Sequence, residues 1–228
     1  MSRPPITGAI VIPAFEEGSR LGKVLARVPS EVPGLDRLRL IVVDDGSQDN
    51  TASVARNAGA IVVRHAVNLG QGGSLRTGTE AALRLGADIV IHMDADGQHP
   101  PEDLPRLVAA LLAGADAVSG VRSFQRPMPW MFILGNQGLA VITRRLFGVS
   151  NPDTQCGYRA FWARSWPGIR WDSPDYAFAS EMLVRSERHG IRWHLIPIQT
   201  IYLDRYKGTG IADGVRILQK LVGWRLSQ

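Results

Sequence analysis

The stretch IVIHMDADGQHPPEDL, from Ile89 to Leu104, does most to decide the fold. It opens with an apolar run, Ile89 to Met93, which predicts a strand whose two faces are both covered. Near its end stands Pro101, and proline is typical of the first turn of a helix. The polar residues between them are therefore expected at the carboxyl end of a buried strand, where open parallel sheets bind their ligands.

That turn carries Asp94 and Asp96, two carboxylates separated by Ala95 and followed by Gly97 and Gln98. Carboxylate and amide oxygens suit a hard divalent cation, so we predict a site for Mg²⁺ or Mn²⁺ with Asp94, Asp96 and Gln98 as ligands. Such a cation can bridge two phosphates and neutralise a diphosphate leaving group. The pattern D-x-D also occurs in ordinary turns, but the buried strand before it favours the metal site.

Strands and helices alternate on both sides of this stretch. Apolar or β-branched runs predict the strands, and apolar residues spaced three and four apart predict helices between them. This alternation is typical of an α/β protein with a mostly parallel sheet sandwiched by helices. The five predicted strands are Ala9 to Ile12, Leu38 to Val43, Ile61 to Val63, Ile89 to Met93 and Ala117 to Ser119.

The second half of the chain is less regular. Helices are expected at Pro129 to Phe147, Ala179 to His189 and Ile211 to Leu226, and an extended segment at Arg192 to Tyr202. A stretch rich in glycine and aromatic residues separates the first two helices, and it is expected to be irregular. Because the 228 residues contain no linker, we expect one domain, with a nucleotide-binding half at about 8–122 and an acceptor-side half at about 123–228.

Every predicted strand ends in polar residues. Because parallel strands end at the same edge of a sheet, these groups are expected around one cleft. Asp45 is the candidate to accept hydrogen bonds from a ribose or base; alternatively, one aspartate of the Asp44–Asp45 pair caps the next helix. The strand ends carry Pro13 to Glu17, Asp44 to Ser47, Asn68 to Gly73, Asp94 to Gln98, and Arg122.

Three arginines, Arg122, Arg159 and Arg205, are expected on loops that face the same rim. A guanidinium fork matches phosphate oxygens, so we expect at least one of them to bind phosphate. The net charge of +5 fits anionic partners in general. Basic and aromatic residues do not interleave on one strand face, so a nucleic-acid partner is not expected.

Membrane and compartment signals are weak in this sequence. The longest apolar stretch, Trp130 to Ile142, is interrupted by Gly135 to Gly138 and is too short to span a bilayer. The single cysteine, Cys156, excludes an internal disulfide. We expect a cytoplasmic protein whose amphipathic helices at 130–147 and 211–226 either contact the inner face of a membrane or pack on their own core.

Taken together, the motifs resemble those of the family-2 inverting glycosyltransferases with a GT-A fold. Within that family they are most similar to the branch of dolichol-phosphate mannose synthases and polyprenyl-phosphate glycosyltransferases. The resemblance runs from about Ala9 to about Ile211. Its carriers are VIPAFEE (11–17), VVDDGSQDNT (42–51), NLGQGGSLRTG (68–78), DADGQHPPEDL (94–104), SGVRSF (119–124), DTQCGYRAF (153–161) and YLDRYKG (202–208).

The resemblance implies roles for the matching positions. Those expected to hold the nucleoside are Pro13, Phe15, Glu17, Val43 and Asp45. Those expected at the metal and diphosphate are Asp94, Ala95, Asp96 and Gln98. Arg122 and Arg205 would contact phosphate and, with Asp96, carry catalysis. Gln155 and Arg159 resemble the part of the pocket where sugar and acceptor meet.

Two positions depart from the family pattern. Glu16 stands where the family usually has asparagine, and Ile211 stands where a lysine commonly follows the motif of Arg205. One phosphate contact is then missing or is supplied by Lys207. This departure bears on the identity of the acceptor more than on the fold.

The implied reaction moves a hexose, mannose or glucose, from a GDP- or UDP-sugar to a polyprenyl or dolichyl phosphate at a membrane surface. A phosphate acceptor is already ionised at neutral pH and needs no general base. Two alternatives remain open. The first is a hydroxyl acceptor on a glycan or small molecule, with Glu181, otherwise a solvated helix residue, or an aspartate of the D-x-D turn as base. The second is a relative that binds nucleotide-sugars without turnover.

Overall fold

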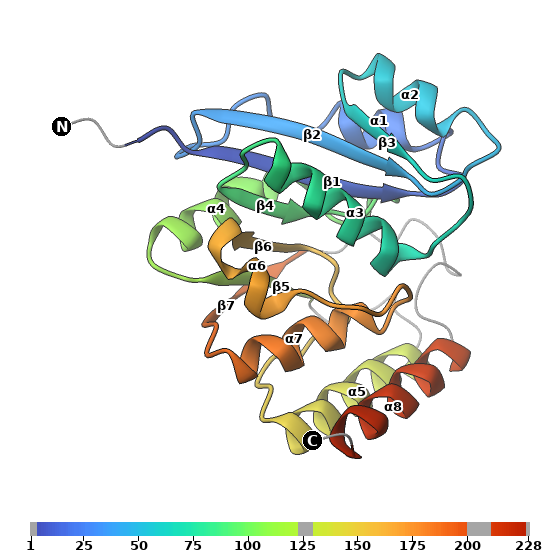
Figure 1. The fold of residues 1–228 in the computed structure, drawn as a ribbon, viewed down its shortest axis with the longest axis vertical. Coiled ribbons are helices and arrows are strands. Elements are labelled where there is room, and N and C mark those ends of the chain that lie inside the picture. Colours follow the sequence, from blue (N-terminus) through green and yellow to red (C-terminus); the bar gives the residue numbers. More distant parts are fainter. Residues whose placement is uncertain (1–3, 123–129, 200–210, 227–228) are drawn as a thin grey trace.

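The computed structural model describes residues 4–122, 130–199 and 211–226. Their strands form one seven-stranded sheet in the order β3-β2-β1-β4-β6-β5-β7. Neighbouring strands are parallel except for β6, which runs antiparallel to β4 and to β5. The predicted α/β class with a mostly parallel sheet is confirmed (Figure 1). The strands are β1 (Thr7–Ala14), β2 (Arg37–Asp44), β3 (Ile61–Arg64), β4 (Ile89–His92), β5 (Ala117–Arg122), β6 (Arg159–Trp162) and β7 (Trp193–Ile198).

Helices cover both faces of the sheet because successive strand residues point to opposite sides. On β1, Ile10 and Ile12 are buried in one cluster with side chains of α1, α2 and α4. Ala9 and Val11 are buried in a second cluster with side chains of α3, α6 and α7. The helices are α1 (Leu21–Leu25), α2 (Thr51–Asn57), α3 (Gln71–Arg84), α4 (Leu104–Leu112), α5 (Trp130–Phe147), α6 (Trp166–Ile169), α7 (Phe178–Arg188) and α8 (Ile211–Leu226).

Strand β6 lies in the stretch that the sequence predicted to be irregular, and that prediction is wrong. Its residues pair with β4 from Trp162 opposite Ile89 to Arg159 opposite His92. The strand is only four residues long and almost wholly buried, so it shows no alternation of polar and apolar residues. Through β6 and β7, the second half of the chain completes the sheet that the first half begins.

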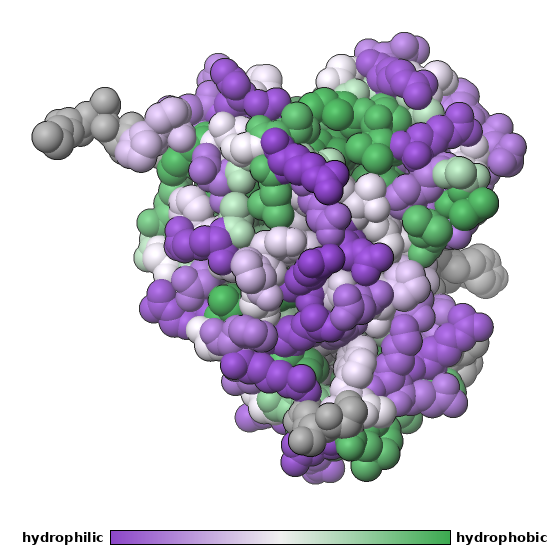
Figure 2. All heavy atoms as spheres, in the orientation of Figure 1, coloured by the Kyte–Doolittle hydropathy of each residue, from purple (hydrophilic) through white to green (hydrophobic). Residues whose placement is uncertain are grey.

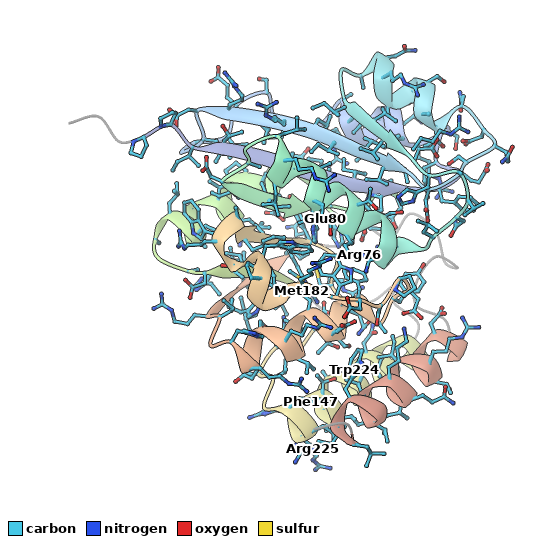
Figure 3. All side chains as sticks on the ribbon, in the orientation of Figure 1. Arg76, Glu80, Phe147, Met182, Trp224 and Arg225 are labelled. Atoms are coloured by element: carbon cyan, nitrogen blue, oxygen red, sulfur yellow. The ribbon has the colours of Figure 1, made fainter. Side chains whose placement is uncertain are left out.

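Helices α5 and α8 lie side by side at the end of the molecule away from β1, β2 and β3 (Figure 1). Leu139 of α5, Leu183 of α7 and Leu221 of α8 are buried in a third hydrophobic cluster. Phe147 and Trp224 pack against the same cluster (Figure 3). One face of each helix therefore packs on the protein's own core. Among the described residues, no helix combines the length and apolar character that crossing a membrane requires.

The chain order of the sheet reverses between β1 and β4. Parallel pairing brings Gly8 opposite Ile89 and Val11 opposite His92, so both strands end at the same edge. The segments that follow them start at Phe15 and Met93. A reversal of this kind opens a crevice beyond the strand ends, which is the usual ligand site of an open α/β sheet.

Candidate active site

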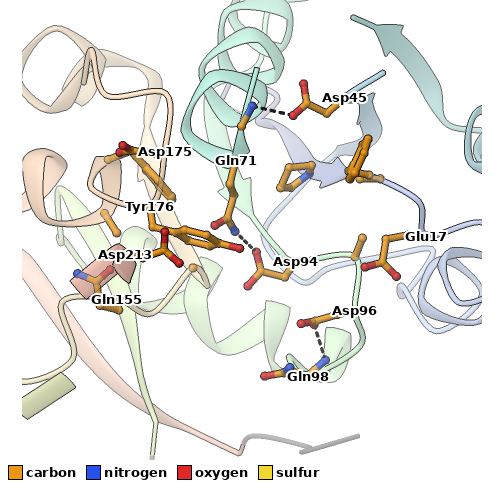
Figure 4. A pocket seen from close by; sticks show the side chains of 18 of the residues that line it. Glu17, Asp45, Gln71, Asp94, Asp96, Gln98, Gln155, Asp175, Tyr176 and Asp213 are labelled. Atoms are coloured by element: carbon orange, nitrogen blue, oxygen red, sulfur yellow. Dashed lines mark hydrogen bonds between the residues drawn. The ribbon is translucent and has the colours of Figure 1, made fainter. Parts of the chain in front are cut away.

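A cleft of about 600 Å³ opens at this edge of the sheet (Figure 4). Its volume is that of a typical small-molecule site. The segments that follow β1, β2, β3 and β4 and the end of β5 all contribute to its lining, as the sequence predicted from their polar residues. The lining residues from these five places are Pro13, Ala14, Phe15, Glu17, Asp45, Asn68, Gly70, Gln71, Asp94, Ala95, Asp96, Gln98, His99 and Arg122.

The carboxylates of Asp94 and Asp96 form the electrostatic centre of the cleft. Burial raises the pKa of Asp94, although the charge of Arg122 and a hydrogen bond from Gln71 act in the opposite direction. Burial, and then the negative charge of Asp94, raise the pKa of Asp96 to about 6. The two groups thus repel each other in a place where water screens them poorly.

Three neighbours surround the Asp94 carboxylate. Gln71 Nε2 donates a hydrogen bond of 2.8 Å to Oδ1 (Figure 4). His99 Nδ1 lies 3.4 Å from Oδ2, but burial lowers the pKa of His99 to about 4, so at neutral pH this ring brings no positive charge. Gly157 approaches so closely that a Cβ there would stand 2.8 Å from Oδ2. Only glycine leaves room for the carboxylate at this point.

The donor set around Asp94 and Asp96 fits a divalent cation that arrives with phosphate. Among the described residues, no group of three or more His, Cys, Asp or Glu side chains could hold a metal. Mg²⁺ in nucleotide sites is commonly held by one or two carboxylates, with water and substrate phosphates completing its shell. Gln98, the third predicted ligand, lines the cleft and donates its backbone N–H to Asp96 Oδ1 at 2.9 Å. The side-chain role predicted for Gln98 stays a prediction.

Asp45 lines the cleft and also builds it. Its carboxylate accepts the backbone N–H groups of Leu69 and Gly70, each at 2.9 Å, and bonds to His65 Nδ1 at 2.7 Å. A carboxylate has about four acceptor positions, so one remains for a ligand. The bonds fix the segment that begins α3 at Gln71 and so place the amide that holds Asp94.

The glycines after β3 belong partly to this helix rather than to a separate loop. Gly72 and Gly73 lie in the first turn of α3, which begins at Gln71. Gly70 precedes the helix with a φ of 87°, and a Cβ there would stand 2.6 Å from the carbonyl oxygen of Pro174. This close contact joins the first half of the chain to the 172–177 segment.

Asp44 has a structural role behind the cleft. It is buried, accepts the backbone N–H of Ser47 at 3.0 Å, and lies 3.0 Å from Arg64 Nε. The alternative that one aspartate of the pair caps the next helix is wrong, because Asp49 accepts the N–H of Thr51 at the start of α2.

Arg122 stands at the cleft with its guanidinium oriented by a buried acid. Its Nε and one terminal nitrogen donate to the two oxygens of Asp153 at 2.8 and 2.7 Å. Asp153 is fully buried and is itself held by Asn151, whose side-chain oxygen accepts its backbone N–H. A two-pronged ion pair of this kind fixes the direction of the guanidinium.

The sequence predicted that Arg159 lies on a loop at the rim of the cleft, and that prediction is wrong. It is the first residue of β6, and its side chain is fully buried. Its guanidinium donates to the carbonyl oxygens of Thr154 and Ala179, both at 2.8 Å. Since Gln155 and Ala179 line the cleft, Arg159 supports that wall from behind.

Glu181 is neither solvated nor part of the cleft lining. It is buried near the start of α7, and its two oxygens accept the backbone N–H groups of Asp172 and Ser173 at 3.0 and 2.9 Å. It therefore shapes the segment that leads to Tyr176. Val43, expected at the nucleoside, is buried in β2 among the residues under α3 and does not line the cleft.

The structure adds a far wall that the sequence analysis did not select. Asp175 and Tyr176 come from the segment before α7, and Asp213 and Arg216 come from α8. Figure 4 shows Tyr176, Asp213 and Gln155 on the opposite side of Asp94 from Asp45 and Glu17. These residues stand far along the chain from the strand ends, so only tertiary structure brings them to the site. Arg205 and Lys207, for which phosphate contacts were expected, lie outside the described residues.

Comparison with known proteins places the chain in a family. The model of "Glycosyl transferase family 2" matches residues 9–166. The chain belongs to glycosyl transferase family 2. Its glycosyltransferase relatives include an undecaprenyl-phosphate mannosyltransferase of Micrococcus luteus, 32% identical over 90% of this chain and 86% of the relative. An uncharacterized protein of Methanocaldococcus jannaschii is 37% identical over 93% of this chain and 90% of its own length.

A solved structure confirms the GT-A fold of this glycosyltransferase. It is glucosyl-3-phosphoglycerate synthase from Mycobacterium tuberculosis, in complex with Mn²⁺, UDP-glucose and phosphoglyceric acid. The two chains superpose with a TM-score of 0.77 at 23% identity, covering 96% of this chain and 80% of the synthase. A likeness at this level of identity establishes the fold.

Asp96→Asn is expected to raise the melting temperature of the metal-free enzyme at pH 7 by roughly a few degrees. The pKa of Asp96 rises from 3.8 to about 6 on folding, so the folded state favours the neutral acid. That stabilisation is complete below about pH 4 and is lost as the pH rises through about 6. Asparagine carries no charge and keeps an oxygen for the N–H of Gln98. Thermal melts in EDTA from pH 4 to pH 7 measure the difference.

The matched control is Glu31→Gln, a change at an exposed acid in the loop between α1 and β2. Its melting temperature should follow that of the wild type at every pH. If the melting temperature of Asp96→Asn at pH 7 equals or lies below that of the wild type, the statement that the folded protein favours the neutral form of Asp96 is wrong.

Proposed function

We propose that this glycosyltransferase moves a hexose, mannose or glucose, from a GDP- or UDP-sugar to a polyprenyl or dolichyl phosphate, with inversion. Mg²⁺ or Mn²⁺ would be held by Asp94 and Asp96. The observation that carries the proposal is the position of the acid pair, which follows β4 directly and lines the cleft at the carboxyl edge of the sheet. A bound divalent cation supplies the charge that stabilises a diphosphate leaving group.

The donor nucleoside would occupy the side of the cleft formed by the ends of β1 and β2. Phe15 lines this side with its ring about half exposed, which offers a flat apolar surface to a base. Asp45 keeps one acceptor position for a ribose hydroxyl, and Glu17 lines the same side. Pro13 completes the lining of the cleft at the end of β1.

The sugar and the acceptor would meet on the side of Gln155 and Tyr176. Gln155 Nε2 donates to Ser180 Oγ at 2.8 Å, which fixes its amide at the wall. Arg122, aimed by Asp153, would stabilise phosphate charge during transfer. The ionised phosphate oxygen would attack the anomeric carbon without a base. The name of the Micrococcus luteus relative supports a lipid-phosphate acceptor, and the UDP-glucose and Mn²⁺ in the mycobacterial synthase support the donor and the metal.

A hydroxyl acceptor is less well supported. Such an acceptor needs a general base, for which the candidates are Glu181 and an aspartate of the D-x-D turn. The aspartates of that turn would hold the cation. The two oxygens of Glu181 are bonded to backbone N–H groups, and Arg185 lies 2.8 Å from Oε1. The carboxylate is therefore engaged away from the cleft, whereas a phosphate acceptor needs no such group.

The pair α5–α8 would bring the enzyme to the inner face of the membrane that holds its acceptor. The outward face of α8 exposes an apolar stripe of Val215, Leu218, Val222 and Leu226, spaced three or four residues apart. Figure 2 shows that this end of the molecule carries both hydrophobic and hydrophilic surface. The exposed Arg144 and Arg145 of α5 stand on the same helix pair. Apolar and basic residues together suit an anionic lipid surface.

Asp96→Ala should lower sugar transfer by about a hundredfold or more, because the leaving group loses its charge stabilisation. The assay supplies radiolabelled GDP-mannose or UDP-glucose, undecaprenyl phosphate in detergent and Mn²⁺, and it measures label in the lipid fraction. Glu31→Gln is the control and should keep full activity. Full turnover of the alanine variant with added metal would refute the metal assignment.

Nucleotide binding by wild type without transfer to phosphate or hydroxyl acceptors would favour a non-catalytic relative.

The double change Leu218→Ser and Val222→Ser should weaken binding to anionic vesicles about tenfold, because it removes apolar area from the stripe. Sedimentation with phosphatidylglycerol vesicles measures the bound fraction. Leu85→Ser is the matched control, since Leu85 at the end of α3 is as exposed as Leu218. Equal binding by all three proteins would exclude the stripe as the contact surface.

A further inference from the structure

Helix α8 is held against the cleft by its inner face. Ile217 and Leu221 are buried in the third hydrophobic cluster. Lys220 Nζ donates to both carboxylate oxygens of Asp175, at 2.9 and 3.0 Å. These contacts fix the helix beside the segment that carries Tyr176. They also place Arg216, one turn before Lys220, in the lining of the cleft.

The cleft that α8 closes is strongly acidic. In the part of the chain that the structure describes, its lining contains six carboxylates, those of Glu17, Asp45, Asp94, Asp96, Asp175 and Asp213. The arginines among the described lining residues are Arg122 and Arg216. A site that must hold a phosphorylated ligand needs positive charge on the side away from the metal. The contacts that each arginine makes within the protein therefore decide which of them can bind a phosphate.

These two arginines differ in how firmly the protein holds them. The guanidinium of Arg122 is bound at 2.7 and 2.8 Å by the buried carboxylate of Asp153. The guanidinium of Arg216 lies 3.9 Å from Asp213 Oδ1, too long for a hydrogen bond, and its side chain is 68% exposed. A phosphate that enters the cleft can therefore replace this loose contact by short, charge-assisted hydrogen bonds.

We infer that Arg216 binds the phosphate monoester of the acceptor and selects phosphorylated acceptors over hydroxyl acceptors. The inference rests on the proposed function. Arg216 follows Asp213 on α8, and Asp213 stands on the side of Asp94 opposite Asp45 and Glu17 (Figure 4). The donor nucleoside belongs to that opposite side, so the phosphate nearest Arg216 is the acceptor's. Val215 and Leu218 are exposed on the outward face of the same helix, where they offer apolar surface to the acceptor's chain beyond its phosphate.

Calorimetric titration of farnesyl phosphate into wild type, Arg216→Ala, Arg216→Lys and Arg225→Ala tests this assignment. Farnesyl phosphate is a short prenyl monophosphate, and its binding can be measured whether or not transfer occurs. Arg216→Ala should weaken its affinity about tenfold or more, because a charge-assisted hydrogen bond is lost. Arg216→Lys keeps the positive charge but loses the planar guanidinium, so its affinity for farnesyl phosphate should lie between those of the wild type and Arg216→Ala. Arg225, exposed on the same helix outside the cleft lining, is the matched control and should change nothing.

Titrations of GDP and UDP with Mn²⁺ into the same proteins distinguish the donor phosphates from the acceptor phosphate. Arg216→Ala should keep wild-type affinity for the nucleoside diphosphate that wild type binds. Equal affinity of wild type and Arg216→Ala for farnesyl phosphate overturns the inference, as does a wild type that fails to bind it. A loss confined to the nucleoside diphosphate also overturns it. The transfer assay judges the proposed function separately, since wild type can bind farnesyl phosphate and still transfer no sugar.

Discussion

The repulsion between Asp94 and Asp96 is the constraint on which the rest of the site depends. Both carboxylates are partly buried, and burial together with the charge of Asp94 raises the pKa of Asp96 to about 6. A fold keeps such a pair only where its surroundings over-determine it. Here the β1–β4 pairing sets the strand end, Gln71 bonds one oxygen of Asp94, and Gly157 leaves space for the other.

Two buried charged side chains, Arg159 and Glu181, lie behind the cleft and stabilise its walls. The Arg159 guanidinium holds the carbonyls of Thr154 and Ala179, so it stabilises the wall that carries Gln155. Glu181 does the same for the segment that leads to Tyr176. Buried charged groups need such partners, because an unpaired one is costly. Arg159 and Glu181 thus fix the walls of the cleft, while Asp94 and Asp96 line the cleft itself.

The sequence predicted correctly those strands and helices that have a local pattern of apolar residues. The five strands of the first half were found because apolar runs and helical spacing repeat there, and parallel strand ends must converge. It failed at β6, whose four buried residues show no period, and at Arg159 and Glu181, because residue type does not reveal whether a charge faces a ligand or a carbonyl. The bond between Gln71 and Asp94 and the arrival of α8 at the cleft are long-range contacts without a local signal.

Calorimetric titration of GDP and UDP into the wild-type enzyme, first with Mn²⁺ and then with EDTA, tests the central claim most directly. If Asp94 and Asp96 hold a cation that bridges a diphosphate, one nucleotide should bind in the presence of Mn²⁺. Its affinity should then fall at least about tenfold in EDTA, because the carboxylates would face the phosphates without the ion between them. Equal affinity in Mn²⁺ and in EDTA, or no binding of either nucleotide, would contradict the account.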